Sequence, residues 1–124
     1  MHSVAVERGG SLACLVVWVN ILRADGPDTA SRAALGLPSD RVRHFYDPHR
    51  RIGKAFAPSL NAGGALVWDV YLFFPPGSRW EAKPAPPADW AHQLGAPWAD
   101  ASRFRSGKNL DQWLRQVTNS PPRN

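Results

Sequence analysis

The chain has 124 residues, six tryptophans, twelve prolines and a net charge of +5, with a sequence pI of about 10.1. This length supports one domain with one hydrophobic core and is too short for two ordinary domains. The tryptophans and the 44% hydrophobic content exclude an intrinsically disordered chain. The single cysteine, Cys14, excludes an internal disulfide, a cysteine-based zinc cluster and dithiol–disulfide oxidoreductase activity by this chain alone.

The basic residues occur in short groups rather than in one block. Arg41 and Arg43 form one group, Arg103 and Arg105 another, and aspartates lie near both. No zinc-finger spacing, RNA-recognition signature or basic heptad region accompanies them. The charge therefore indicates an arginine-rich surface, and a nucleic-acid partner is not expected.

The amino-terminal region contains an apolar run that must be separated from targeting signals. Residues 1–10 are polar and are expected to be a loose lead-in. Leu12–Leu22 is interrupted by Trp18 and Asn20, which is unusual for the core of a signal peptide. No stretch approaches the roughly 20 apolar residues of a membrane span. We expect no membrane span and favour a cytoplasmic location, while secretion stays open.

The first half of the chain predicts two strands, each followed by a helix. Leu12–Leu22 is continuously apolar, which is typical of a central strand buried on both faces. A short helix is expected over Thr29–Leu35 and a second strand over Arg41–Tyr46. Asp47 is placed to cap a second helix that contains Ile52–Phe56.

The second half predicts two more strands and a final helix. After a break at 61–64, Ala65–Phe74 is apolar on both faces and is expected to be an interior strand. Pro75–Ser78 fits a type II turn, and Arg79–Glu81 would begin a returning edge strand. Asn109–Val117 carries an apolar stripe at helical spacing.

Between the last strand and the final helix lies a stretch rich in proline and tryptophan. Residues 82–106 show no sustained periodicity and are interpreted as a long loop, with at most a short helix near Asp89–Leu94. Residues 119–124 are interpreted as a tail.

The order of these elements resembles the thioredoxin fold. Thioredoxins carry Cys-Gly-Pro-Cys after a buried strand; here Val16–Ala24 runs into Asp-Gly-Pro-Asp at 25–28. The stretch HFYDPHR…WDVYLFFPPGSRW is also similar to uncharacterised bacterial thioredoxin-like proteins. The resemblance covers residues 12–81 and 108–118. It implies a single α/β domain over 1–124, in which helices flank a central mixed sheet of about four strands.

The same comparison shows what this chain lacks. Aspartate stands at both cysteine positions, and the family's cis-proline position reads Gly63-Gly64-Ala65. The resemblance therefore implies a redox-inactive protein, and no cofactor is expected.

The first candidate site is the pair Asp25 and Asp28. At the positive end of a helix, two carboxylates could bind a divalent cation or share a proton. Both residues are equally explained as helix caps. His44, which precedes Asp47 and His49, is a further candidate metal ligand.

Asp69 is the third candidate, because it would lie inside an apolar strand. An unpaired carboxylate there would cost several kcal/mol, so a partner is required. An arginine or the backbone of the 61–64 break could supply it. The pair would then be structural, or the carboxylate would be a catalytic one.

The aromatic side chains and the glycine break suggest a ligand surface. Tryptophans beside a polar loop can form a peptide groove, or they can pack the loop against the core. The candidate ligand-binding residues are Gly63, Gly64, Trp90 and Trp98.

The leading hypothesis is a module that binds an unknown protein or peptide and has no dithiol redox activity. The alternative is a metal-binding protein or a carboxylate-dependent enzyme that uses Asp25 and Asp28. A third hypothesis is that Cys14 acts alone as a peroxidatic or mixed-disulfide thiol, which requires an exposed sulfur.

Overall fold

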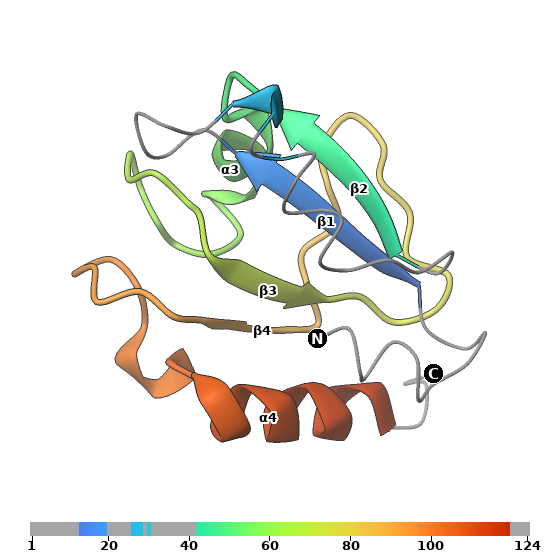
Figure 1. The fold of residues 1–124 in the computed structure, drawn as a ribbon, viewed down its shortest axis with the longest axis vertical. Helices are drawn as coiled ribbons and strands as arrows, with labels where there is room; N and C mark the ends of the chain where they lie inside the picture. The colour runs from blue at the N-terminus through green and yellow to red at the C-terminus, as the bar shows by residue number, and fades with distance from the viewer. Residues whose placement is uncertain (1–12, 20–25, 29, 31–41, 120–124) are drawn as a thin grey trace. The chain divides into compact units, whose positions relative to one another are not determined.

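The computed structural model describes residues 13–19, 26–28, 30 and 42–119. The chain divides into two compact units, residues 1–52 and 53–124, and each is described by itself. Figure 1 shows the elements in the order β1, β2, α3, β3, β4, η2 and α4. The predicted helix Thr29–Leu35 falls almost entirely outside the described residues.

The first unit contains a parallel pair of strands. β1 (Cys14–Val19) pairs with β2 (Val42–Asp47) in a register that runs from Cys14↔Val42 to Val19↔Asp47. Both predicted strands are therefore confirmed. The prediction that the first strand is buried on both faces was wrong. Leu15 of β1 is 59% exposed, and Phe45 of β2, on the same face of the pair, is 51% exposed.

Helix α3 (Arg51–Phe56) confirms the predicted second helix. Its last residue, Phe56, belongs to the second unit, where it is buried and contacts two aromatic rings of the same unit. The ring of Phe74 lies 5.9 Å away and that of Trp80 lies 5.2 Å away, edge-on. Trp80 thus packs the segment after the Pro75–Ser78 turn against Phe56 of α3, although 48% of Trp80 stays exposed.

The second unit contains an antiparallel pair. β3 (Val70–Phe73) pairs with β4 (Asp89–His92), from Val70↔His92 to Phe73↔Asp89. The predicted strand Ala65–Phe74 was too long, because Asp69 has a positive φ of 53°, which ends the extended backbone. His92 also forms a parallel bridge with Phe104.

The chain returns to the sheet later than predicted. The turn at Pro75–Ser78 is confirmed: the Ser78 amide donates to the Pro75 carbonyl at 3.2 Å, and Gly77 has a φ of 84°. Arg79–Glu81 forms no strand. The returning strand is β4, so the interpretation of 82–106 as a loop, or as a loop with a short helix, was wrong at 89–92.

These differences overturn the predicted fold class. Among the described residues there are two separate two-stranded sheets, with order β1–β2 and β3–β4. They contain no central sheet of four strands flanked by helices, so the thioredoxin-like architecture was wrong. The described parts make a small α/β protein.

Helix α4 (Gly107–Asn119) confirms the predicted final helix and covers the β3–β4 pair (Figure 1). Leu110 and Trp113 are buried with Ala91 of β4. Four partly buried side chains complete this core: Tyr71, Phe73, Leu114 and Val117. Within the described residues, no helix is both long and apolar enough to cross a bilayer.

Gly53 of α3 gives a test of this packing. A Cβ at this position would lie 2.5 Å from the Val67 carbonyl oxygen. We expect Gly53→Ala to destabilise the protein by about 1–3 kcal/mol, because overpacking outweighs the better helix propensity of alanine. Urea-induced unfolding measures the change.

The matched control is Gly64→Ala, because an added Cβ there meets no atom within 4 Å. Its stability should stay within about 0.5 kcal/mol of the parent. A Gly53→Ala variant as stable as Gly64→Ala would contradict this description of α3.

Candidate functional site

The Asp89 carboxylate joins three elements of the second unit. Its Oδ1 accepts hydrogen bonds from Arg103 Nη1 and from the Trp90 amide, both at 2.8 Å. Its Oδ2 accepts from Trp113 Nε1 at 3.3 Å. Because Arg103 belongs to η2 (Ala101–Arg103) and Trp113 to α4, one side chain connects β4, η2 and α4.

Arg103 extends this connection onto the aromatic side chains. Its Nη1 also donates to the Trp90 carbonyl at 3.0 Å, and its guanidinium lies 5.1 Å from the centre of the Trp90 ring. Asp100 lies 3.7 Å from Arg103 Nε. Trp90 in turn stacks on Trp98, with ring centres 6.4 Å apart. Trp90 is only 8% exposed, so this predicted ligand-binding residue packs the loop against the core.

His92 fixes the other end of the same loop. It is 1% exposed; its Nδ1 accepts from the Leu94 amide at 3.0 Å, and its Nε2 lies 2.6 Å from the Asp100 carbonyl oxygen. These partners assign the proton to Nε2, which donates to that carbonyl. The ring also meets Phe104 edge-on at 5.9 Å. His92 therefore has a structural role: it holds the segment between Leu94 and Asp100 in place, and its ring supports that of Phe104.

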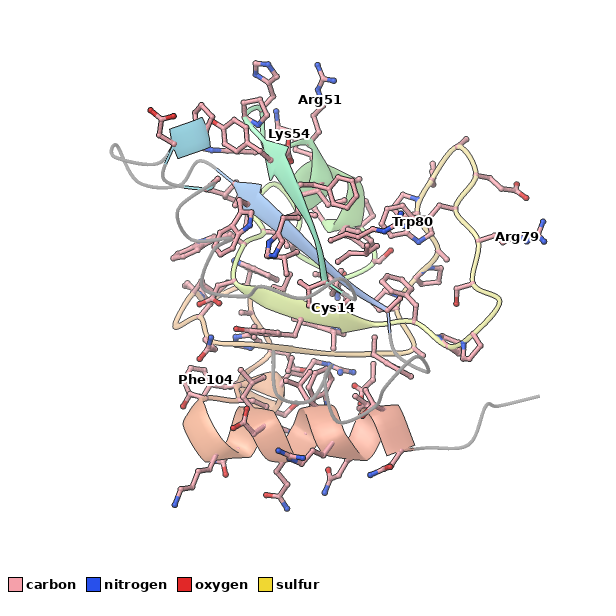
Figure 2. All side chains as sticks on the ribbon, turned by 45° about the vertical axis from the view of Figure 1, so that its right-hand side comes forward. Cys14, Arg51, Lys54, Arg79, Trp80 and Phe104 are labelled. Atoms are coloured by element: carbon pink, nitrogen blue, oxygen red, sulfur yellow. The ribbon has the colours of Figure 1, made fainter. Side chains whose placement is uncertain are left out.

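An open cavity of about 310 Å³ lies beside α4 and is called the groove below. It is lined by Phe104, Arg105, Asn109, Gln112, Trp113 and Gln116. Trp113 is buried, whereas Phe104 is 47% exposed. Figure 2 shows Phe104 beside the N-terminal end of α4. The volume is at the lower end of the roughly 300–1,000 Å³ found for ligand pockets, which suits a short segment better than a large cofactor.

The described polar residues of the groove lining carry amide groups that can form hydrogen bonds with a ligand. Asn109 and Gln112 lie one turn apart on α4, and within the described chain their side chains make no hydrogen bond. Each amide can donate and accept at once, as a peptide group does. The groove thus combines an exposed aromatic ring with paired amides.

Sequence reasoning missed the groove. Its available signal was Phe104, an aromatic residue that precedes the final helix by a short segment. The polar positions Asn109, Gln112 and Gln116 of that helix follow helical spacing. Helical spacing alone does not predict which of these side chains line a cavity.

Only one residue of the predicted carboxylate pair, Asp28, belongs to the part of the chain that the structure describes. Asp25 lies outside the described residues, and Asp28 is exposed. Within the described part of the chain, no group of three or more histidine, cysteine, aspartate or glutamate side chains could hold a metal ion. His44 instead stacks on Trp18, whose Nε1 donates to His44 Nδ1 at 3.1 Å.

Asp69 has a partner that the sequence did not suggest. Its Oδ1 accepts from Gln93 Nε2 at 3.3 Å, and the same nitrogen donates to the Tyr71 hydroxyl at 3.0 Å. Burial, followed by the negative charge of Asp69, raises the pKa of Tyr71. Among the described residues, the carboxylate is therefore held by an amide, and not by an arginine or by the backbone of 61–64.

The remaining candidates lie apart from the groove lining. Gly63 and Gly64 are exposed in the turn after α3. Cys14 is half-buried in β1, and burial raises the pKa of its thiol, which disfavours the reactive thiolate.

No family model matches this chain, and no curated protein or solved structure shows significant similarity to it. The resemblance to thioredoxin-like proteins stays a prediction.

The Asp89–Arg103 contact can be tested by removing one partner. We expect Asp89→Ala to lower the free energy of unfolding by about 1–2 kcal/mol, because Arg103 and the Trp113 N–H lose their acceptor. Both members of the ion pair are partly exposed, which limits the loss. The control Glu81→Ala, at an exposed carboxylate, should change stability by less than about 0.5 kcal/mol. Equal effects of the two substitutions in urea unfolding would refute the connecting role of Asp89.

Asp47 provides a pH-dependent test in the first unit. Burial alone would raise its pKa, but the amides of Ile52, Arg51 and His49, with the Arg51 charge, outweigh burial and lower the pKa below 3.8. Ile52 N–H donates to Asp47 Oδ2 at 2.8 Å. A lowered folded pKa gives stability that is complete above the unfolded value and is lost as the pH falls through the folded value.

We therefore expect Asp47→Ala to be less stable than the parent at neutral pH, with the difference shrinking below about pH 4. Denaturant unfolding as a function of pH measures this, and NMR titration of the Asp47 carboxyl gives its pKa directly. A stability difference between Asp47→Ala and the parent that stayed constant down to about pH 2, roughly two units below the pKa of an unfolded aspartate, would be inconsistent with this account.

Proposed function

We propose that this protein is a peptide-binding module and that the groove beside α4 is its binding site. The observation that carries the proposal is Phe104, an aromatic side chain that is 47% exposed at the edge of a cavity. Large exposed apolar groups at a concave surface are typical of interaction sites.

The surroundings of Phe104 support a preformed site. Its ring rests on the buried His92, and the neighbouring Arg103 is held by Asp89. A side chain that is already fixed loses little conformational entropy when a ligand covers it. Phe104 can therefore contribute more to affinity than a mobile surface residue would.

The amides of Asn109 and Gln112 support a peptide as the ligand. A side-chain amide can accept from a peptide N–H and donate to a peptide carbonyl at the same time. Two amides one turn apart can pair with peptide groups that face the same side of an extended segment, which come from alternate residues. An apolar side chain of that segment would then cover Phe104 and Trp113.

The test is selection of short random peptides displayed on phage, using the whole protein as bait. We expect enrichment of peptides that bind in the micromolar range, and a loss of affinity of at least about tenfold for Gln112→Ala, equivalent to about 1.4 kcal/mol. Gln112 is exposed and makes no side-chain hydrogen bond within the described chain, so the melting temperature should not change. Phe104→Ala should weaken the same peptides.

The matched control is Lys108→Ala, an exposed position on α4 that does not line the groove. Its affinity should equal that of the parent. Selection without enrichment, or enriched peptides that bind Phe104→Ala and Gln112→Ala as tightly as the parent, would reject the proposal.

A further inference from the structure

We infer that the groove selects an extended peptide segment in which an acidic residue lies within about two positions of an apolar one. This inference rests on the proposed function and specifies the ligand of the same site. It depends on Arg105, which is the only charged side chain among the described residues that line the groove.

Arg105 is held in place by neutral groups. Its Nη1 donates to the Ser102 carbonyl at 2.8 Å and to the Phe104 carbonyl at 2.9 Å. Within the described residues it forms no ion pair with a carboxylate. The guanidinium is thus fixed beside the groove with its charge uncompensated.

Arg103, two residues earlier, shows the contrast. It pairs with Asp89 at 2.8 Å and lies 3.7 Å from Asp100. A carboxylate ligand would find the charge of Arg103 already neutralised, whereas at Arg105 it would form a new charge-assisted hydrogen bond. The described residues of the groove lining include no aspartate or glutamate that would repel such a ligand.

The apolar requirement follows from the neighbouring residue. Phe104 and Arg105 are adjacent, so their Cα atoms are about 3.8 Å apart. In an extended ligand, residues are separated by about 3.3 Å each. The acidic and apolar side chains that contact the two groups must therefore lie within about two positions of each other.

The whole chain favours the same charge in its partner. A net charge of +5 attracts acidic segments and accelerates encounter, and salt weakens this effect. A nucleic acid would instead require a line of cations that follows successive phosphates, whereas the groove offers one.

The experiment compares three fluorescent peptides that differ only in charge. Each has a central leucine in a glycine–serine background, flanked by glutamate, by glutamine or by lysine. Anisotropy with the full chain should give binding of the glutamate peptide at least about tenfold tighter than that of the lysine peptide, with the glutamine peptide between them. A single-stranded thymidine oligonucleotide is measured in parallel.

Three variants assign the preference to Arg105. Arg105→Gln should reduce it to less than about threefold, whereas Arg105→Lys keeps the charge and should retain most of it. Because Arg105 also holds two backbone carbonyls, Arg105→Lys distinguishes loss of charge from loss of local structure. The control Lys108→Gln removes a cation of α4 that lies outside the groove and forms no ion pair with the described carboxylates. It should leave the preference unchanged.

Equal affinity for the three peptides would overturn the inference and leave the peptide-binding function standing. Equal losses in Arg105→Gln and Lys108→Gln would also overturn it, because any surface cation would then suffice. Tighter binding of the oligonucleotide than of the glutamate peptide would replace it with a nucleic-acid site. Binding of none of these probes, together with no enrichment from the displayed peptides, would reject both the inference and the proposed function.

Discussion

The contact between Asp89 and Arg103 determines where the chain between β4 and α4 lies. Asp89 also accepts a hydrogen bond from the Trp113 indole, so the same carboxylate positions the inner face of α4. Without it, the Arg103 guanidinium and the Trp113 N–H would be left without this acceptor at the edge of the core. The pair is partly exposed, and its role is positional more than energetic.

The groove is a direct consequence of that positioning. Phe104 and Arg105 directly follow Arg103, and the Arg105 amide donates to the His92 carbonyl at 2.9 Å. The segment is therefore fixed on one side by β4 and joined directly to α4 on the other. What remains between Phe104 and α4 is a surface that the described side chains do not fill, with Trp113 as its buried part.

Local patterns in the sequence predicted the local elements well. The apolar stripe identified α4, and the run Arg41–Tyr46 was correctly predicted to be the strand that the structure shows as β2. The prediction of a strand over Ala65–Phe74 failed because Asp69 adopts a left-handed backbone, and Asp69 contacts a residue 24 positions away, Gln93, which local patterns do not reveal. β4 was missed for a similar reason: its four residues become a strand only because β3 pairs with them, and tertiary context outweighs weak local preference.

At the candidate site, too, prediction from the sequence is limited by contacts between residues that are distant along the chain. Arg103 and Arg105 are both arginines near aspartates in the sequence, and no local rule separates them. They differ because Asp89, 14 residues before Arg103, forms its ion pair with Arg103, while the Arg105 side chain donates to backbone carbonyls of its own segment. One arginine thereby becomes part of the scaffold, and the other keeps its charge at the groove. A sequence can place cations near an interaction surface, but which of them keeps an uncompensated charge is decided by contacts distant along the chain.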